Sequence, residues 1–172
     1  MVLDVIKERF SVRSFEDRSV ESEKIEALLE AARLAPSARN LQVCHFIVLE
    51  DEKKRKQLTD ICKGQKFVSQ APITIAVCAT NGDYTMTCGH KANLIDAAIA
   101  GEHIALQAVT LGLGSCWIGA FYQEKMAKLI ELPDDYEVVA LLPIGYPATS
   151  KKPRKLKSIE EISSYNVYKE SQ

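Results

Sequence analysis

The spacing of apolar residues along the chain alternates between helical and extended periods. Four apolar residues before Pro36 recur at i, i+3, i+4 and i+7, namely Ile25, Leu28, Leu29 and Ala32. This spacing predicts an amphipathic helix with one buried face, and Pro36 ends it because proline cannot continue a helix. Residues 73–79 are almost wholly apolar, which predicts a strand buried on both faces or nearly so.

Residues 93–111 form the longest predicted helix, and its apolar side chains go nearly all the way round. Such a helix must be covered on most sides, and a second copy of the chain is a natural cover. Asp96, His103 and Gln107 fall on one narrow stripe of this helix. The stripe either meets polar groups across an interface or faces solvent.

The remaining segments alternate loosely between helix and strand. Shorter helices are predicted at residues 2–9, 51–62, 123–131 and 158–162, and strands at residues 45–49, 116–118 and 137–145. Residues 82–92 contain two glycines and no period, which predicts a loop of the length that often forms a lid. The strands lack the glycine loops of nucleotide-binding βαβ units, which favours a single α+β domain over residues 1–172 with a mixed or antiparallel sheet.

Composition and charge narrow the functional classes. The 172 residues carry 22 basic and 23 acidic side chains, and this balance argues against a nucleic-acid-binding domain. Polar residues interrupt the most apolar run, so no membrane span is expected. Five cysteines without a CxxC pair, after a start without a basic-then-apolar leader, predict reduced thiols in a cytoplasmic protein. Cys88 and His90 are too few ligands for a zinc site, so no metal is expected.

Two pairs of basic residues are candidates for binding a phosphate. Arg9, Ser11 and Arg13 alternate along a stretch that is predicted to be extended, so their side chains are expected to point to one face. Guanidinium groups bind phosphate bidentately and keep their charge. Surface pairing of the two arginines with nearby acids is an equally weighted alternative. Lys152 and Arg154 form the second pair, which is informative only if it lies beside the first.

Residues 35–42, Ala-Pro-Ser-Ala-Arg-Asn-Leu-Gln, are predicted to form a rigid loop with backbone donors between a helix and a strand. An ordinary helix-to-strand connection is the alternative. Gly112, Gly114 and Gly119 do not make a dinucleotide fingerprint, because they follow a helix and their spacing is wrong. No nucleophile with a neighbouring base stands out, so no catalytic side chain is expected.

Taken in order, these motifs resemble those of the nitroreductase family of flavin enzymes. The matching stretches are residues 9–13, 35–42, 112–119, 145–147 and 152–154. The resemblance implies an α+β nitroreductase-like fold, with a central sheet flanked by helices, and an intertwined homodimer that binds FMN at its interface. The chain differs from the family in having Val43-Cys44 where Pro-Trp is frequent, and Phe10 where a second basic residue is frequent.

The resemblance also implies a set of cofactor-binding residues. These are Arg9, Phe10, Ser11, Arg13, Pro36, Ser37, Ala38, Asn40, Trp117, Ile118, Gly119, Lys152 and Arg154. Arg9 and Ser11 are implied to hold the phosphate with the two C-terminal cations, and Arg13 to reach the pyrimidine edge of the flavin. The residues of the 35–42 loop are implied to come from the other subunit, and residues 117–119 to offer backbone donors to flavin N5.

The activity that this resemblance implies is hydride transfer from NAD(P)H to FMN, followed by reduction of a small acceptor such as a nitroaromatic or quinone. The hydride travels through the cofactor, which agrees with the absence of a catalytic side chain. Residues 82–92 are expected to gate the flavin, with contacts from Tyr84, Met86 and His90. The alternatives are a specialised FMN reductase of the dehalogenase or ene-reductase type, a flavin-binding protein with little turnover, and a structural dimer without a cofactor.

Overall fold

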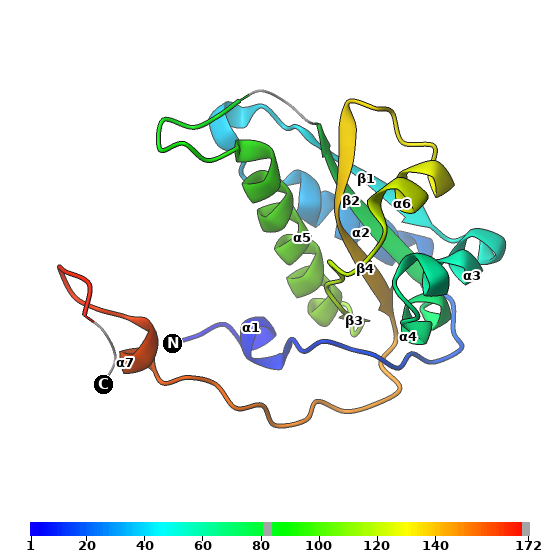
Figure 1. Cartoon of the computed structure of the whole chain (residues 1–172). Coiled ribbons are helices and arrows are strands. Elements are labelled where there is room, and N and C mark those ends of the chain that lie inside the picture. The colour runs from blue at the N-terminus through cyan, green and yellow to red at the C-terminus, as the bar shows by residue number, and fades with distance from the viewer. Residues whose placement is uncertain (81–83, 170–172) are drawn as a thin grey trace.

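A computed structural model describes residues 1–80 and 84–169 of the chain (Figure 1). The helices are α1 (Asp4–Glu8), α2 (Ser22–Arg33), the short 3₁₀ turn η1 (Ala38–Asn40), α3 (Glu52–Ile61), α4 (Lys66–Gln70), α5 (Ala92–Thr110), α6 (Gln123–Leu129) and α7 (Ile159–Ile162). The strands are β1 (Cys44–Leu49), β2 (Ile73–Thr80), β3 (Gly114–Ser115) and β4 (Tyr136–Gly145).

The four strands form one sheet in the order β1-β2-β4-β3. Every pair of neighbouring strands is antiparallel, and the β2–β4 pair shifts register between Val77 and Cys78. The sheet therefore agrees with the predicted α+β class and is antiparallel rather than mixed in its named strands. The N-terminal segment continues the sheet edge through an isolated parallel bridge between Ser11 and Ser115.

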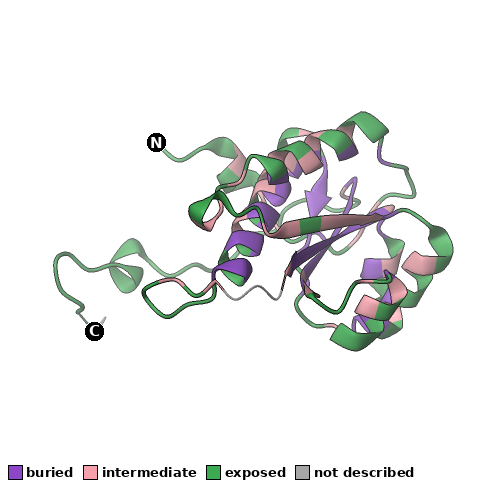
Figure 2. Ribbon diagram, turned by 90° about the horizontal axis from the view of Figure 1, so that it is seen from above, coloured by how far each residue is buried: buried purple, intermediate pink, exposed green. Residues whose placement is uncertain are grey.

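Two apolar cores cover the two faces of the sheet, as the burial pattern in Figure 2 shows. Helices α2 and α5 pack on one face against Ile75 and Val77, whereas α3, α4 and α6 pack on the other against Ala76 and Cys78. Strand β2 is buried from Ile73 to Ala79, which confirms the strand predicted to be covered on both faces. The amphipathic helix before Pro36 is also confirmed, with Leu28 fully buried.

One predicted strand needs correction, and one short helix was not predicted. The brief strand predicted at residues 116–118 is wrong, because β3 occupies Gly114–Ser115 and only Ile118 bridges to Leu141. The chain turns at Gly112, which has a φ of +72°, and so reaches the sheet edge two residues earlier. Helix α4 was not predicted, since its five residues are too few to show a period. Residues 82–83 of the predicted lid lie outside the described residues.

A C-terminal arm, residues 151–169, runs away from the packed layers as an extended segment that contains α7 (Figure 1). Every residue of this arm is exposed. Its exposed large apolar side chains are Leu156, Ile159, Ile162, Tyr165, Val167 and Tyr168. Among the described helices, none has the length and apolar character to cross a membrane.

Candidate active site

The N-terminal segment is held against β3 by backbone pairing. The Val12 N–H donates to the Ser115 carbonyl at 3.0 Å, and the Val12 side chain is 1% exposed. A Cβ at Gly114 would overlap Val12, so only glycine admits this close approach. With Val12 turned inward, its neighbours Ser11 and Arg13 are exposed on the opposite side, as the predicted alternation requires.

Ser11 and Arg13 line a cavity of about 510 Å³ together with Phe10, Lys152 and Arg154. One member of the first predicted basic pair, Arg13, therefore meets both members of the second, Lys152 and Arg154, although about 140 residues separate them along the chain. None of the three cations has an ion pair with a carboxylate among the described residues. A hydroxyl and three unpaired cations in one cavity have the chemistry that binds a phosphate.

Arg9 lies apart from this cavity. Its Nε is 3.9 Å from Oε1 of Glu102 on α5, and neither Glu8 nor Glu16 pairs with it among the described residues. The sulfur of Cys116 lies nearby, where burial raises the pKa of the thiol while Arg13, Ser11 and Arg9 act to lower it. The predicted Arg9-x-Ser11-x-Arg13 cluster is thus gathered around Cys116. Only its last two members open into the cavity of about 510 Å³ shared with Lys152 and Arg154, which we call the cationic cavity.

The loop at residues 35–42 forms a tight turn whose backbone is strained. Arg39, Asn40 and Gln42 all have φ between 52° and 57°, which is the left-handed region that side-chained residues disfavour. The Ser37 hydroxyl accepts from the Gln42 N–H at 3.1 Å. The Ala38 N–H donates to both carboxylate oxygens of Asp96, each at 3.1 Å.

This loop and the cationic cavity lie near opposite ends of α5. Asp96, near the start of the helix, contacts the loop, whereas β3, which follows the end of the helix, pairs with the N-terminal segment (Figure 1). A helix of 19 residues is about 28 Å long. The loop instead borders a separate cavity of about 250 Å³ that Pro36, Ser37 and Asp96 help to line.

The segment with Trp117, Ile118 and Gly119 lies on the sheet edge beside α5. The N–H of Ile118 donates to the Leu141 carbonyl at 2.9 Å, so it is not free to bind a ligand. Within the described residues, the N–H of Gly119 has no protein acceptor, which leaves it as a candidate donor. The Trp117 indole rests on Gly101, and it is 41% exposed.

The described part of the predicted lid, residues 84–92, is a small hydrogen-bonded hairpin rather than an irregular loop. Thr85 bridges to Lys91, and the Met86 N–H donates to the His90 carbonyl at 2.9 Å. The Arg39 guanidinium lies 5.5 Å from the centre of the Tyr84 ring. The hairpin therefore contacts the strained loop and not the cationic cavity. In the described part of the chain, no cluster of three His, Cys, Asp or Glu side chains marks a metal site.

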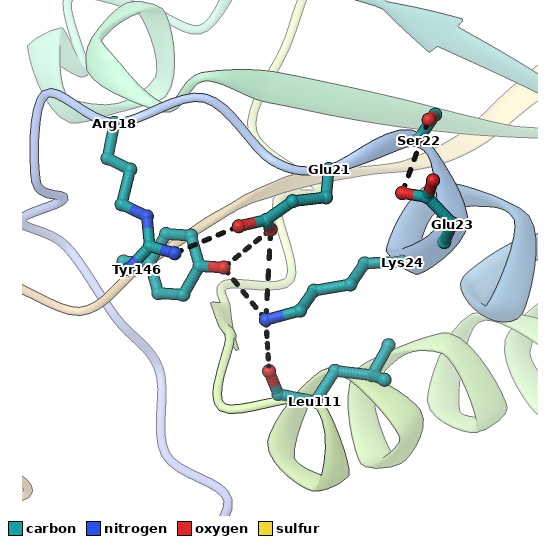
Figure 3. A network of polar contacts seen from close by, with 7 residues as sticks. All are labelled: Arg18, Glu21, Ser22, Glu23, Lys24, Leu111 and Tyr146. Carbon is teal, nitrogen blue, oxygen red and sulfur yellow. Dashed lines mark hydrogen bonds and ion pairs between the residues drawn. The ribbon is translucent and has the colours of Figure 1, made fainter.

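A polar network that the sequence did not reveal ties α2 to the end of β4 (Figure 3). The Tyr146 hydroxyl donates to Glu21 at 2.6 Å and accepts from Lys24 at 2.8 Å. Arg18 lies over the Tyr146 ring, 3.8 Å from its centre. The hydrogen bond from Tyr146 is the main reason that the pKa of Glu21 falls to about 2. Lys24 also donates to the Leu111 carbonyl, which fixes the end of α5 next to β3.

An antiparallel α+β scaffold, with three cations in one cavity that have no ion pair within residues 1–80 and 84–169, defines a protein suited to a phosphorylated ligand. A family model described as "Putative TM nitroreductase" matches residues 1–172, so the chain belongs to the nitroreductase family. The predicted family membership is confirmed.

Relatives and solved structures agree with this assignment. The chain is 34% identical over 157 residues, 87% of each protein, to a "Putative NADH dehydrogenase/NAD(P)H nitroreductase" of Archaeoglobus fulgidus. It is 30% identical over 176 residues to an NAD(P)H FMN reductase of Bacillus subtilis, which covers 89% of this chain and 69% of that protein. The structure of an FMN-dependent nitroreductase from Clostridium difficile matches with a TM-score of 0.81 and 31% identity, over 95% of this chain and 98% of that one. This likeness confirms the predicted nitroreductase-like fold.

Proposed function

We propose that the protein is an FMN-dependent oxidoreductase that accepts a hydride from NAD(P)H and reduces a small acceptor. The observation that carries this proposal is the cavity in which Ser11, Arg13, Lys152 and Arg154 meet. FMN ends in a phosphate dianion, which these groups would neutralise and bind. The names of the family relatives, which include FMN reductases and an FMN-dependent nitroreductase, support the same cofactor.

FMN supplies the hydride chemistry when it is bound, and the protein supplies binding and orientation. In this proposal, Ser11 and the two C-terminal cations bind the phosphate, and Arg13 reaches the pyrimidine edge of the flavin. A fixed positive charge at that edge stabilises the negative charge that reduction places there. Gly119 offers its free N–H toward the central ring. Arg9 lies just outside the cavity and contributes positive charge from beside Glu102.

We also propose that the working form is an intertwined homodimer. The 35–42 loop lies at the opposite end of α5 from the cationic cavity, so a second copy is needed to bring the loop to the flavin. Two exposed apolar surfaces support this assembly. Leu94 and Ile95 on α5 are 45% and 40% exposed, and the apolar side chains of the C-terminal arm have no cover in the single chain.

The acceptor in this proposal is a small molecule that binds against the flavin, such as a nitroaromatic or a quinone. Trp117 is exposed beside Gly119, where it offers an aromatic surface to such a planar molecule. The structure also keeps the strained loop and the 84–92 hairpin in contact through Arg39 and Tyr84. In the dimer, the hairpin of one copy would thus accompany its loop to the edge of the partner's flavin.

The test compares the binding of FMN with that of riboflavin, which lacks the phosphate. Lys152→Ala and Arg13→Ala are each expected to weaken FMN binding by about tenfold to a hundredfold, since a hydrogen bond to a charged group contributes about 1.5–3 kcal/mol. Lys152→Ala should leave riboflavin binding unchanged. Lys155→Ala and Lys157→Ala are matched controls, because these lysines lie on the same exposed arm but do not line the cavity.

The proposal also requires that the purified protein with FMN is bleached by NADH or NADPH in a stopped-flow experiment. Tight FMN binding without bleaching would favour a flavin-binding protein with little turnover. Equal loss of FMN and riboflavin binding in Lys152→Ala would remove the cavity as the phosphate site.

A further inference from the structure

The loop at residues 35–42 has an unfavourable backbone conformation at three positions, and none of these positions carries the glycine that would relieve it. Arg39, Asn40 and Gln42 adopt the left-handed backbone conformation at φ values of 53°, 57° and 52°, and none of them is glycine. Side-chained residues disfavour this region because their Cβ crowds the backbone. Such a conformation persists only when surrounding contacts hold it.

Most of the contacts that hold the loop come from within it. The Asn40 N–H donates to the Ser37 carbonyl at 3.0 Å, and the Gln42 N–H donates to the Ser37 hydroxyl at 3.1 Å. These bonds close the turn, but they do not fix where the turn sits on the protein. Arg39 stacks over Tyr84, which belongs to the hairpin and not to the packed layers.

Asp96 provides the one described hydrogen bond that joins the backbone of residues 36–41 to α5. Its two carboxylate oxygens accept from the Ala38 N–H at equal distances of 3.1 Å, across 58 residues of sequence. The side chain is only 4% exposed and has no ion pair with a cation among the described residues. A buried carboxylate is costly without compensating hydrogen bonds, so its placement under this loop is a specific structural feature.

Asp96 belongs to a helix that is itself held firmly by its packing. This helix packs against both β2 and β4, so the Asp96 carboxylate is attached to the packed core of the molecule. Its neighbours Ala97 and Ala100 are buried in the core with Ile104. The hydrogen bond to Ala38 therefore fixes the first residue of the η1 turn, which directly precedes the left-handed Arg39, relative to α5.

We propose that Asp96 is a positioning residue for cofactor binding. It fixes Ala38 on α5 and thereby holds Ser37 and Asn40 in the orientation that they present to the flavin of the partner subunit. This inference rests on the proposed function, because it is the proposed dimer that brings the loop to the flavin. Asp96 itself does not touch the flavin in this arrangement.

The first experiment compares Asp96→Ala with the isosteric Asp96→Asn in the full-length protein. Without FMN, hydrogen exchange of the 36–43 backbone is expected to accelerate at least about tenfold in Asp96→Ala, because one hydrogen bond to a charged group is lost. Asparagine keeps one oxygen acceptor, so Asp96→Asn should show an intermediate effect. Asp60→Ala, which removes an exposed carboxylate on α3, is the control.

The second measurement is the affinity for FMN and its rescue. Asp96→Ala is expected to weaken FMN binding by about tenfold, the equivalent of 1.4 kcal/mol. Adding Arg39→Gly should recover several-fold of this loss, because glycine adopts the left-handed conformation without a Cβ clash. A role limited to general stability would not be rescued by a glycine at this one position.

The outcomes separate the two proposals. If the wild-type protein does not bind FMN, the proposed function is wrong. Amide hydrogen exchange of residues 36–43 then still tests whether the Asp96–Ala38 hydrogen bond holds the loop. If the wild type binds FMN but Asp96→Ala keeps both its affinity and its slow exchange, the positioning role is wrong. If Asp96→Ala does not fold, the Asp96→Asn variant decides. Unchanged FMN affinity and unchanged hydrogen exchange in Asp96→Asn would overturn the positioning role. Weaker FMN binding together with faster exchange confined to residues 36–43 would support it.

Discussion

The indole of Trp117 rests on Gly101 of α5, where a Cβ would overlap the Cζ3 and Cη2 atoms of the ring. Trp117 is the single tryptophan of the chain. It is 41% exposed and lies next to the proposed N–H donor of Gly119. The absence of a side chain at position 101 therefore sets how closely the indole approaches the helix, and the tryptophan fluorescence reports on that contact.

Gly101→Ala is expected to displace the indole into solvent. The clash falls on the free edge of a partly exposed ring, so the ring should move rather than the backbone. Stability should change by less than about 1 kcal/mol, because alanine favours the helix by a similar amount. The tryptophan emission should shift to the red and FMN binding should weaken. Thr110→Ala on the same helix is the control, and an unchanged emission maximum would contradict the prediction.

The Glu21 carboxylate should make stability depend on pH in the acid range. Hydrogen bonding from Tyr146 lowers its pKa in the folded protein from 4.5 to about 2. The unfolded chain therefore takes up the proton first as the pH falls. The stabilisation by Glu21 is complete above about pH 4.5 and is lost as the pH falls toward 2.

Glu21→Gln removes the ionised form and tests this dependence. We expect the variant to be less stable than the wild type near neutral pH, and the difference in urea midpoint to disappear as the pH approaches 2. Glu26→Gln, which alters an exposed carboxylate on the same helix, should not show this convergence. A stability difference that persists at the acid end would rule out Glu21 ionisation as its source.

The C-terminal arm should be required for the proposed dimer. Ile159 and Ile162 lie on one face of α7 and are 71% and 70% exposed. Replacing both with aspartate is expected to shift the protein toward single copies in sedimentation and to release FMN at the same time. Glu160→Gln on the same helix should leave the assembly intact. A double variant that remains dimeric would show that the arm does not hold the two copies together.

Thiol reactivity should be limited to one cysteine per chain. Cys88 is exposed, whereas burial raises the pKa of Cys62 to about 11 and that of Cys78 to about 12. Burial and the nearby Asp96 raise the pKa of Cys44 to about 11 as well. At about pH 8, a thiol-specific reagent should modify one residue quickly and the rest slowly, because only the thiolate reacts. Cys88→Ser should abolish the fast phase; a fast phase that remains would contradict this assignment.

The sequence by itself determined those features that depend on neighbouring residues. The period of the apolar residues predicted α2 and α5, and an unbroken apolar run predicted β2. The alternation around Val12 predicted that Ser11 and Arg13 share one face. Such predictions succeed because helical and extended chains each impose a fixed angular spacing on successive side chains.

Tertiary structure alone decided which distant groups meet. The Asp96 carboxylate bonds the Ala38 N–H across 58 residues, and Tyr146 bonds Glu21 across 125. The predicted stripe on α5 did not reveal that Asp96 would turn inward to a loop of its own chain, nor that His103 would lie 3.2 Å from the Ala31 carbonyl. Nothing local marks such pairs, because packing of the helices on the sheet sets the distance between them. The same packing brings Lys152 and Ser11 to one cavity. It leaves the 35–42 loop at the far end of α5, from which the proposed dimer would bring the loop to the partner's flavin.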